Sequence, residues 1–294
     1  MSVALTAAGQ ASTPARRHLE VWTIALAGLA AFMTALDTLM VITALPVLRA
    51  SLHASLSGLE WTVNAYNLAF ACLLLTGAAL GDRFGRRRVF CAGLLVFTAG
   101  STAAALSSTA AALVAARVIQ GAGAAIATPL SLTLLVEAFP AQRRGGAIGS
   151  WGGIVGTAVG VGPVLGGAVV GGLDWHWMFW LNVPVGAIVI ALSWRHLAES
   201  RGPRSPLDPI GLILAAVGLL GVTFGLVRAN ALGWSAPYIV LSITAGTAVL
   251  AAFVAWERRS LHPMLPVALF ARRGFATANA VSFFMYAGLF GTLF

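Results

Sequence analysis

The sequence contains few charges and no lysine. Only 9% of its 294 residues are charged, and all 18 basic residues are arginine. Soluble domains carry roughly 25% charged residues, whereas this chain is 59% apolar and has a mean hydropathy of +0.89. This composition excludes an ordinary soluble domain. The two cysteines, Cys72 and Cys91, lack metal-ligand spacing, and we interpret them as small apolar side chains.

The sequence also lacks the patterns of enzymes and nucleotide-driven pumps. Its five histidines are not spaced as metal ligands, and we find no phosphate-binding loop and no nucleophile with a paired base. These absences argue against an ATP-driven pump and against a membrane enzyme. We therefore expect no cofactor.

Long apolar segments make up most of the chain. A transmembrane helix needs about 20 predominantly apolar residues, and nine segments meet this requirement. They are 22–48, 58–80, 89–107, 110–138, 146–171, 177–195, 208–228, 234–255 and 275–294. The sequence therefore predicts an all-α polytopic membrane protein.

The arginines predict its orientation. If the N-terminus is cytoplasmic, every arginine except Arg49, Arg117 and Arg228 lies in the cytoplasmic segments between the apolar runs. Positively charged short loops stay on the inner side of a membrane. We expect a multi-pass protein of the cytoplasmic membrane with its N-terminus inside. The lipid bilayer, and not nucleic acid, accounts for the net charge of +9.

Two opposite charges lie within the apolar segments, where a charge costs about 2.5–3.5 kcal/mol on the insertion scale. Asp37 lies ~13 Å from the outer end of the first segment, and Arg117 lies ~10 Å from that of the fourth. Asn64 and Asn67 occur at ~9–13 Å, and Gln120 shares the face of Arg117. One interpretation is a polar cavity in which Asp37 exchanges a proton; the other is a buried ion pair that holds helices in register.

Two glycine-containing segments and one aromatic segment also stand out. Residues 81–88 hold five charged residues and two glycines between apolar runs, which predicts a tight cytoplasmic turn. Gly162–Gly167 places a proline among glycines and predicts either a hinge or a static kink. The tryptophan-rich stretch 174–180 is typical of an outer interfacial anchor; its alternative role is substrate stacking.

Five motifs in order resemble the drug:proton antiporter branch of the major facilitator superfamily that has fourteen helices. They are Leu36–Pro46 (L-D-x-T-x-V-x-x-A-L-P), Ala78–Val89 (G-x-L-x-D-R-x-G-R-[RK]), Arg117–Gly123 (R-x-x-Q-G-x-G), Gly162–Gly167 (G-P-x-x-G-G) and Trp175–Pro184 (W-R-W-x-F-x-I-N-x-P). The chain departs from these patterns at Leu39, Ala78, His176 and Leu181.

The resemblance implies roles for individual residues. Asp37 would couple protons, and Arg117 would support that step. The substrate cavity would be lined by Thr34, Thr38, Asn64, Asn67 and Gln120. The cytoplasmic gate motif would consist of Gly81, Asp82, Arg83, Gly85, Arg86 and Arg87. The antiporter hinge motif would consist of Gly162, Pro163, Gly166 and Gly167.

The resemblance also implies a division of the chain. Residues 1–20 would be a cytoplasmic tail, 21–198 an N-terminal six-helix bundle, 199–256 a linker with two extra helices, and 257–294 a cytoplasmic loop with the first helix of a C-terminal bundle. Because the sequence ends inside an apolar segment, we expect it to be a truncated form of a longer transporter.

The leading hypothesis is a secondary transporter that exports small amphipathic drugs or toxic compounds by alternating access. Protons would be the coupled ion, and the proton motive force would take the place of a cofactor. The first alternative is a dedicated exporter of an endogenous metabolite or antibiotic. A second is a non-transporting half-transporter that serves as a receptor or scaffold.

Overall fold

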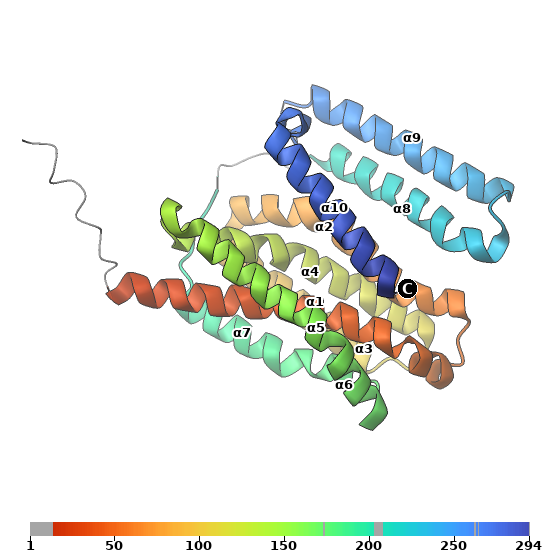
Figure 1. Cartoon of the computed structure of the whole chain (residues 1–294), viewed down its shortest axis with the longest axis horizontal. Coiled ribbons are helices and arrows are strands. Elements are labelled where there is room, and N and C mark those ends of the chain that lie inside the picture. Colours follow the sequence, from red (N-terminus) through yellow and green to blue (C-terminus); the bar gives the residue numbers. More distant parts are fainter. Residues whose placement is uncertain (1–13, 173, 203–207, 262, 264, 294) are drawn as a thin grey trace, which may run out of the picture.

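The computed structural model describes residues 14–293 except 173, 203–207, 262 and 264, and the described residues form helices and short connections without a strand (Figure 1). The α-helices are α1 (Pro14–Leu52), α2 (Leu56–Phe84), α3 (Arg86–Ala105), α4 (Ala110–Ala138), α5 (Arg144–Gly172), α6 (Trp177–Trp180), α7 (Asn182–His196), α8 (Pro209–Leu232), α9 (Pro237–Arg259) and α10 (Arg273–Leu293). Two 3₁₀ turns, η1 (Ala141–Arg143) and η2 (Val267–Ala271), precede α5 and α10. The predicted all-α membrane fold is confirmed.

Eight spans in the described part of the chain are long and apolar enough to cross a membrane, and they correspond to the first eight predicted segments. The ninth predicted segment, 275–294, overlaps α10, whose described residues are not among these eight spans. Helix α1 continues through Pro46 to its end at Leu52, four residues beyond the predicted segment.

The sixth predicted segment is not one continuous helix. One residue, Leu181, separates α6 from α7, and its backbone stays helical with φ of −58° and ψ of −33°. Its nitrogen still donates to the Trp177 carbonyl over 3.0 Å. Pro184 accounts for the interruption, because proline has no N–H to donate to the carbonyl of Trp180 four residues earlier. Asn182 is the first residue of α7.

The predicted turn at residues 81–88 is shorter than expected. Helix α2 continues to Phe84 and α3 begins at Arg86, so Gly85 alone connects them. Gly85 has a φ of +110°, a backbone conformation that side chains with a Cβ rarely adopt. Most residues of the expected loop therefore belong to the ends of two helices, which directs their charges toward neighbouring elements.

Helices α1 to α7 pack into a bundle with α4 in contact with α1, α2 and α3. Small residues permit close approach of the backbones, because packing drives helix association in lipid. A Cβ added at Gly123 of α4 would lie 2.3 Å from the backbone nitrogen of Phe97 on α3. The buried apolar side chains form two main clusters, one around Met40, Leu48 and Trp175 and the other around Leu26, Phe90 and Phe97.

Helices α8 and α9 form an antiparallel pair beside the bundle (Figure 1). The pair contacts the bundle through α2 and α8. Trp61 of α2 lies with its ring centre 6.2 Å from that of Phe224 on α8. Helix α9 leads through residues 260–272 to α10.

The α3–α4 contact gives a first prediction. Gly123→Ala should destabilise the protein by about 1–3 kcal/mol, the usual cost of overpacking, because its Cβ would overlap the α3 backbone. Thermal unfolding in detergent measures this effect. Gly149→Ala is the control, because nothing lies within 4 Å of its Cβ position and alanine favours a helix by about 1 kcal/mol. Equal melting temperatures for the two variants would contradict the prediction.

Candidate functional site

The structure brings the two membrane-embedded charges into contact. Asp37 of α1 is 2% exposed and Arg117 of α4 is fully buried. Arg117 Nη1 donates a hydrogen bond to Asp37 Oδ2. The side chains lie between the two apolar clusters, since Met33 and Met40 on either side of Asp37 belong to different clusters.

Polar side chains from other helices surround this ion pair. Gln120 Nε2 donates to Asp37 Oδ1 over 3.1 Å, and Asn182 Nδ2 of α7 donates to the same oxygen over 2.7 Å. Gln120 Nε2 also donates to Ser101 Oγ of α3 over 2.7 Å. We call Asp37, Ser101, Arg117, Gln120 and Asn182 the polar network. Each of its members is at least 95% buried.

Helix α2 contributes to the network through its backbone and one aromatic ring. Arg117 Nε donates to the carbonyl oxygen of Thr62 over 3.0 Å. The guanidinium carbon lies 4.2 Å from the ring centre of Tyr66, within the range of a cation–π contact. Arg117 Nη2 is buried and has no hydrogen-bond partner among the described residues. The arginine therefore has one donor group that the present arrangement does not use.

A cavity of about 270 Å³ lies beside the network. Its lining comes from α1, α2, α4 and α5: Ala31, Thr34, Ala35, Thr38, Leu39, Tyr66, Asn67, Phe70, Thr128, Trp151, Val155 and Val159. Three of the five predicted cavity residues, Thr34, Thr38 and Asn67, line it. Gln120 belongs instead to the polar network, and Asn64 is in neither set. Tyr66 belongs to the cavity wall and also stacks on Arg117.

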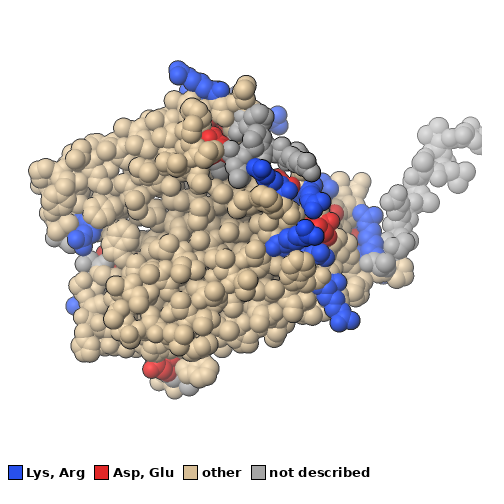
Figure 2. Space-filling model, turned by 180° about the vertical axis from the view of Figure 1, so that it is seen from behind, with Lys and Arg blue, Asp and Glu red and all other residues tan. Residues whose placement is uncertain are grey.

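The gate motif forms an ion-pair chain at one end of the bundle. Arg86 Nε donates to Asp82 Oδ1 over 2.8 Å, and Arg86 Nη1 pairs with Glu137 at the end of α4. Figure 2 shows many of the visible arginines gathered with acidic residues toward one end of the molecule. Arg83 is exposed and makes no ion pair with a described residue. A Cβ on Gly81 would lie 2.2 Å from Leu130 Cδ2, so this glycine lets α2 approach α4.

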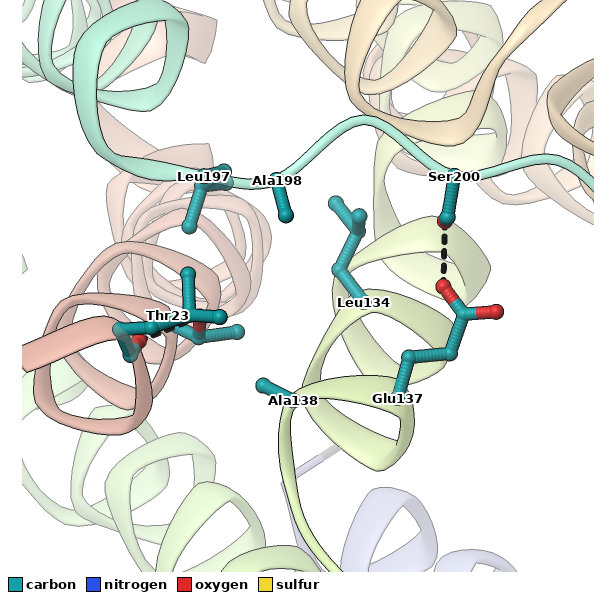
Figure 3. A pocket seen from close by; sticks show the side chains of 8 residues that line it. Thr23, Leu134, Glu137, Ala138, Leu197, Ala198 and Ser200 are labelled. Atoms are coloured by element: carbon teal, nitrogen blue, oxygen red, sulfur yellow. Dashed lines mark hydrogen bonds between the residues drawn. The ribbon is translucent and has the colours of Figure 1, made fainter. Parts of the chain in front are cut away.

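The segment after α7 contacts the same end of the bundle as the gate motif. Glu199 Oε1 accepts a hydrogen bond from the backbone nitrogen of Arg87 over 3.1 Å, and its carboxylate lies 3.6 Å from Arg88 Nε. Ser200 Oγ donates to Glu137, and both residues line a pocket of about 210 Å³ (Figure 3). Glu137 and Glu199 were not predicted, because they lie far from the motif in sequence.

The glycine-proline motif packs against α1 with one side only. A Cβ on Gly162 would lie 2.7 Å from Leu39 Cβ, and one on Gly166 would lie 2.2 Å from Thr43 Oγ1. Gly167 has nothing within 4 Å of its Cβ position. Helix α5 continues unbroken through the proline of this motif. The motif therefore provides a close contact between α5 and the helix that carries Asp37.

The tryptophan-rich stretch divides between the core and the surface. Trp175 is 3% exposed and its Nε1 donates to Ser51 Oγ over 2.9 Å, whereas Trp177 is 50% exposed. The predicted interfacial anchor is therefore wrong for Trp175, which packs in the core. Asp174 is exposed, and hydrogen bonds from His176 lower the pKa of its carboxyl.

The chain is similar in sequence to several known resistance and export proteins. It is 38% identical over 263 residues to the methylenomycin A resistance protein of Streptomyces coelicolor, covering 89% of this chain and 55% of that protein. It is 34% identical over 290 residues to the tetracenomycin C resistance and export protein of Streptomyces glaucescens, covering 97% and 54%. It is 34% identical over 276 residues to the multidrug resistance protein Stp of Mycobacterium tuberculosis, covering 93% and 51%. The chain thus spans about half the length of these relatives.

The fold is also shared with solved transporters. The crystal structure of a peptide transporter POT in complex with sulfate superimposes with a TM-score of 0.60 at 17% identity, covering 81% of this chain and 53% of that one. At this identity the likeness concerns the fold alone. Residues 27–294 match the family described as the Major Facilitator Superfamily. The chain therefore belongs to the Major Facilitator Superfamily.

Proposed function

We propose that this chain forms part of a proton-coupled exporter of small amphipathic compounds that works by alternating access. The observation that carries the proposal is the position of Tyr66, which lines the cavity and stacks on Arg117 of the buried ion pair. A ligand site and a titratable site thus share a side chain. Charged residues inside a membrane protein are functional by default, because their burial is costly.

Proton binding at Asp37 would change the partners of Arg117. A proton on the carboxylate removes the negative charge that Arg117 Nη1 contacts. The guanidinium would keep the Thr62 carbonyl and Gln120 Oε1 as acceptors, but a buried cation without a counter-ion is unfavourable by several kcal/mol. The rearrangement that relieves this cost would move α1 relative to α4, and Arg117 Nη2 provides a free donor for a new contact.

Helix α1 would transmit this movement. It carries Asp37, the cavity residues Thr34 and Thr38, and the residues Leu39 and Thr43 that contact the α5 glycines. A shift of α1 would therefore alter the cavity wall and the α1–α5 contact together. In this proposal Gly162–Gly167 acts as a sliding contact, and its proline does not need to break α5.

The gate motif would control the cytoplasmic end. The Asp82–Arg86–Glu137 chain joins the α2–α3 turn to the end of α4, and Glu199 and Ser200 join it to the segment after α7. The concentration of arginines supports a cytoplasmic location for this end and for the N-terminus. We propose the same division as the sequence does, with a six-helix bundle at 21–198, a linker hairpin at 199–256 and the start of a second bundle at 257–294.

Amphipathic compounds fit the chemistry of the cavity. Its lining combines Tyr66, Phe70 and Trp151 with aliphatic side chains and with a few hydroxyl and amide groups, as is typical of small-molecule sites. A dedicated antibiotic exporter is the second candidate, favoured by relatives named for methylenomycin A and tetracenomycin C. Transport assays with ethidium and with these two antibiotics distinguish broad from dedicated export.

If Asp37 couples protons to export, one pair of variants should recover stability without recovering transport. Asp37→Asn should destabilise the protein by about 3–5 kcal/mol, because it leaves Arg117 as an unpaired buried charge. The same substitution should abolish the uptake of ethidium that a pH gradient drives in inside-out vesicles. Asp37→Asn with Arg117→Gln removes both charges and should recover most of the stability without recovering transport. Thermal unfolding and dye uptake measure the two effects.

The exposed Asp174 gives the matched control, and Asp174→Asn should leave uptake unchanged. Proton-driven uptake by Asp37→Asn at the wild-type rate would refute the coupling role. Failure of the double variant to recover stability would instead show that the network needs these two side chains for more than charge balance.

The gate proposal predicts different effects for two arginines of one motif. Arg86→Gln should reduce the export rate several-fold, because it removes the ion pairs of Arg86 with Asp82 and Glu137. Arg83→Gln should have little effect, because Arg83 is exposed. Initial rates of dye export, normalised to the amount of protein in the membrane, measure the difference. Similar rates for the two variants would argue against a gate at Arg86.

A further inference from the structure

The connection between α9 and α10 carries exposed positive charge. Helix α9 ends at Arg259, and α10 begins at Arg273. Four exposed arginines lie at these two helix ends, and we call them the juxtamembrane arginines: Arg258, Arg259, Arg272 and Arg273. None of them forms an ion pair with a described residue. Their charge is therefore available to an anionic partner.

The two acidic residues at this end of the α8–α9 pair are buried and serve the fold. Asp208 is 8% exposed, and its carboxylate accepts hydrogen bonds from the backbone nitrogen of Gly211 over 2.9 Å and from Trp256 Nε1 over 2.7 Å. Glu257 is 3% exposed and accepts a hydrogen bond from the backbone nitrogen of Leu265 over 2.9 Å. Neither carboxylate lies at the surface beside the juxtamembrane arginines.

Apolar side chains of the same connection are also exposed. Leu261 is 92% exposed and Phe270 is 44% exposed. Neither belongs to one of the eight spans, so the lipid-facing side of a membrane-spanning helix does not account for their exposure. Basic residues next to exposed apolar residues are typical of segments that lie in the membrane interface. This combination favours a bilayer as the anionic partner over a soluble polyanion.

Contacts within the protein hold the connection beside the ends of the two helices. The hydrogen bond from Leu265 reaches Glu257 in the last turn of α9. The ring of Phe270 packs edge to face on that of Phe275 in α10, with 5.0 Å between the ring centres. Trp256 is 37% exposed at the same end of α9, and tryptophan is enriched at the level of the lipid headgroups. The connection is therefore fixed at the membrane interface.

We propose that the juxtamembrane arginines bind the headgroups of anionic phospholipids in the leaflet that meets this end of the protein. A guanidinium group can donate two hydrogen bonds to one phosphate. A zwitterionic lipid offers the same phosphate, but its own ammonium group offsets the negative charge, so the arginines should prefer a lipid with a net charge. Leu261 and Phe270 would enter the apolar part of the interface. Bound lipid would then fix the end of the α8–α9 pair relative to the bilayer.

Two variants with the same change in charge test this assignment. The first replaces the four juxtamembrane arginines by glutamine. The control replaces four other exposed arginines that also form no ion pair with a described residue: Arg83, Arg144, Arg195 and Arg201. Because both variants lose the same net charge, only the position of the arginines distinguishes them.

Trp256 reports on the site, because it lies within one helical turn of Arg258 and Arg259. Trp234, which is 63% exposed in the turn at the other end of the α8–α9 pair, is the internal reference. The protein is labelled with 5-fluorotryptophan and placed in phosphatidylcholine nanodiscs, and Trp256→Phe and Trp234→Phe assign the ¹⁹F NMR signals. Phosphatidylglycerol or phosphatidylcholine with a nitroxide near the glycerol end of one acyl chain is then included at equal mole fraction.

The wild type and the control variant should show a lipid preference at Trp256. We expect labelled phosphatidylglycerol to broaden the Trp256 signal several-fold more than labelled phosphatidylcholine, and the two lipids to broaden the Trp234 signal equally. In the juxtamembrane variant the two lipids should broaden the Trp256 signal equally. High salt should reduce the preference of the wild type, because ions screen exposed charges; this measurement needs no substitution and remains decisive if a variant does not fold.

Four results would overturn the proposal. Equal broadening at Trp256 in the wild type, or a preference that does not change with salt, would exclude recognition of headgroup charge. A preference that persists in the juxtamembrane variant would assign it to other groups. Equal losses in both variants would show that total charge, and not this site, attracts the lipid. A Trp256 signal that neither lipid broadens would show that protein covers the connection. None of these readouts measures transport, so they are independent of the proposed export function.

Discussion

The ion pair between Asp37 and Arg117 constrains the whole bundle. Two charges in a nonpolar interior lose more hydration energy than their attraction returns unless their remaining hydrogen-bonding groups are also satisfied. The bundle meets most of this requirement, all but the Nη2 group of Arg117, with groups from α2, α3, α4 and α7, so at least five helices must be in register at this level. The two apolar clusters on either side of the pair exclude water and make any mismatch of this layer costly.

The ion pairs of the gate motif contribute to stability in a different way from the buried pair. Arg86 is 12% exposed at its side chain and Glu137 36%, so water screens each pair and its separate contribution is small. Their effect comes from connectivity, because one chain of contacts links the α2–α3 turn, α4 and the segment after α7. Such contacts can break and reform at low cost. Under the proposed function this suits a surface that opens, whereas the buried pair suits a site that responds to a single proton.

Depth along a helix can be predicted from sequence, but the direction of a side chain around the helix axis cannot. Residue counting placed Asp37 and Arg117 at one level, and the structure joins them. The same counting predicted both Asn64 and Asn67 as cavity residues, yet of the two only Asn67 lines the cavity. The reason is that helix rotation and tilt are set by packing against neighbouring helices. Ser101 and Asn182 were not predicted to join the network, because the sequence does not show which neighbours a polar side chain will contact. The apolar segments, by contrast, are long enough to be recognised one at a time.

The separation of the cavity from Asp37 bears on how coupling would work. A substrate and a proton can compete for one carboxylate only if the substrate reaches it, but Asp37 is 2% exposed and does not line the cavity. Under the proposed function, the link must therefore run through shared structure. Helix α1 and Tyr66 are the elements common to both sites. An exporter of this design can accept substrates of varied shape and charge, because the proton step depends on the position of α1 and not on a bond between substrate and carboxylate.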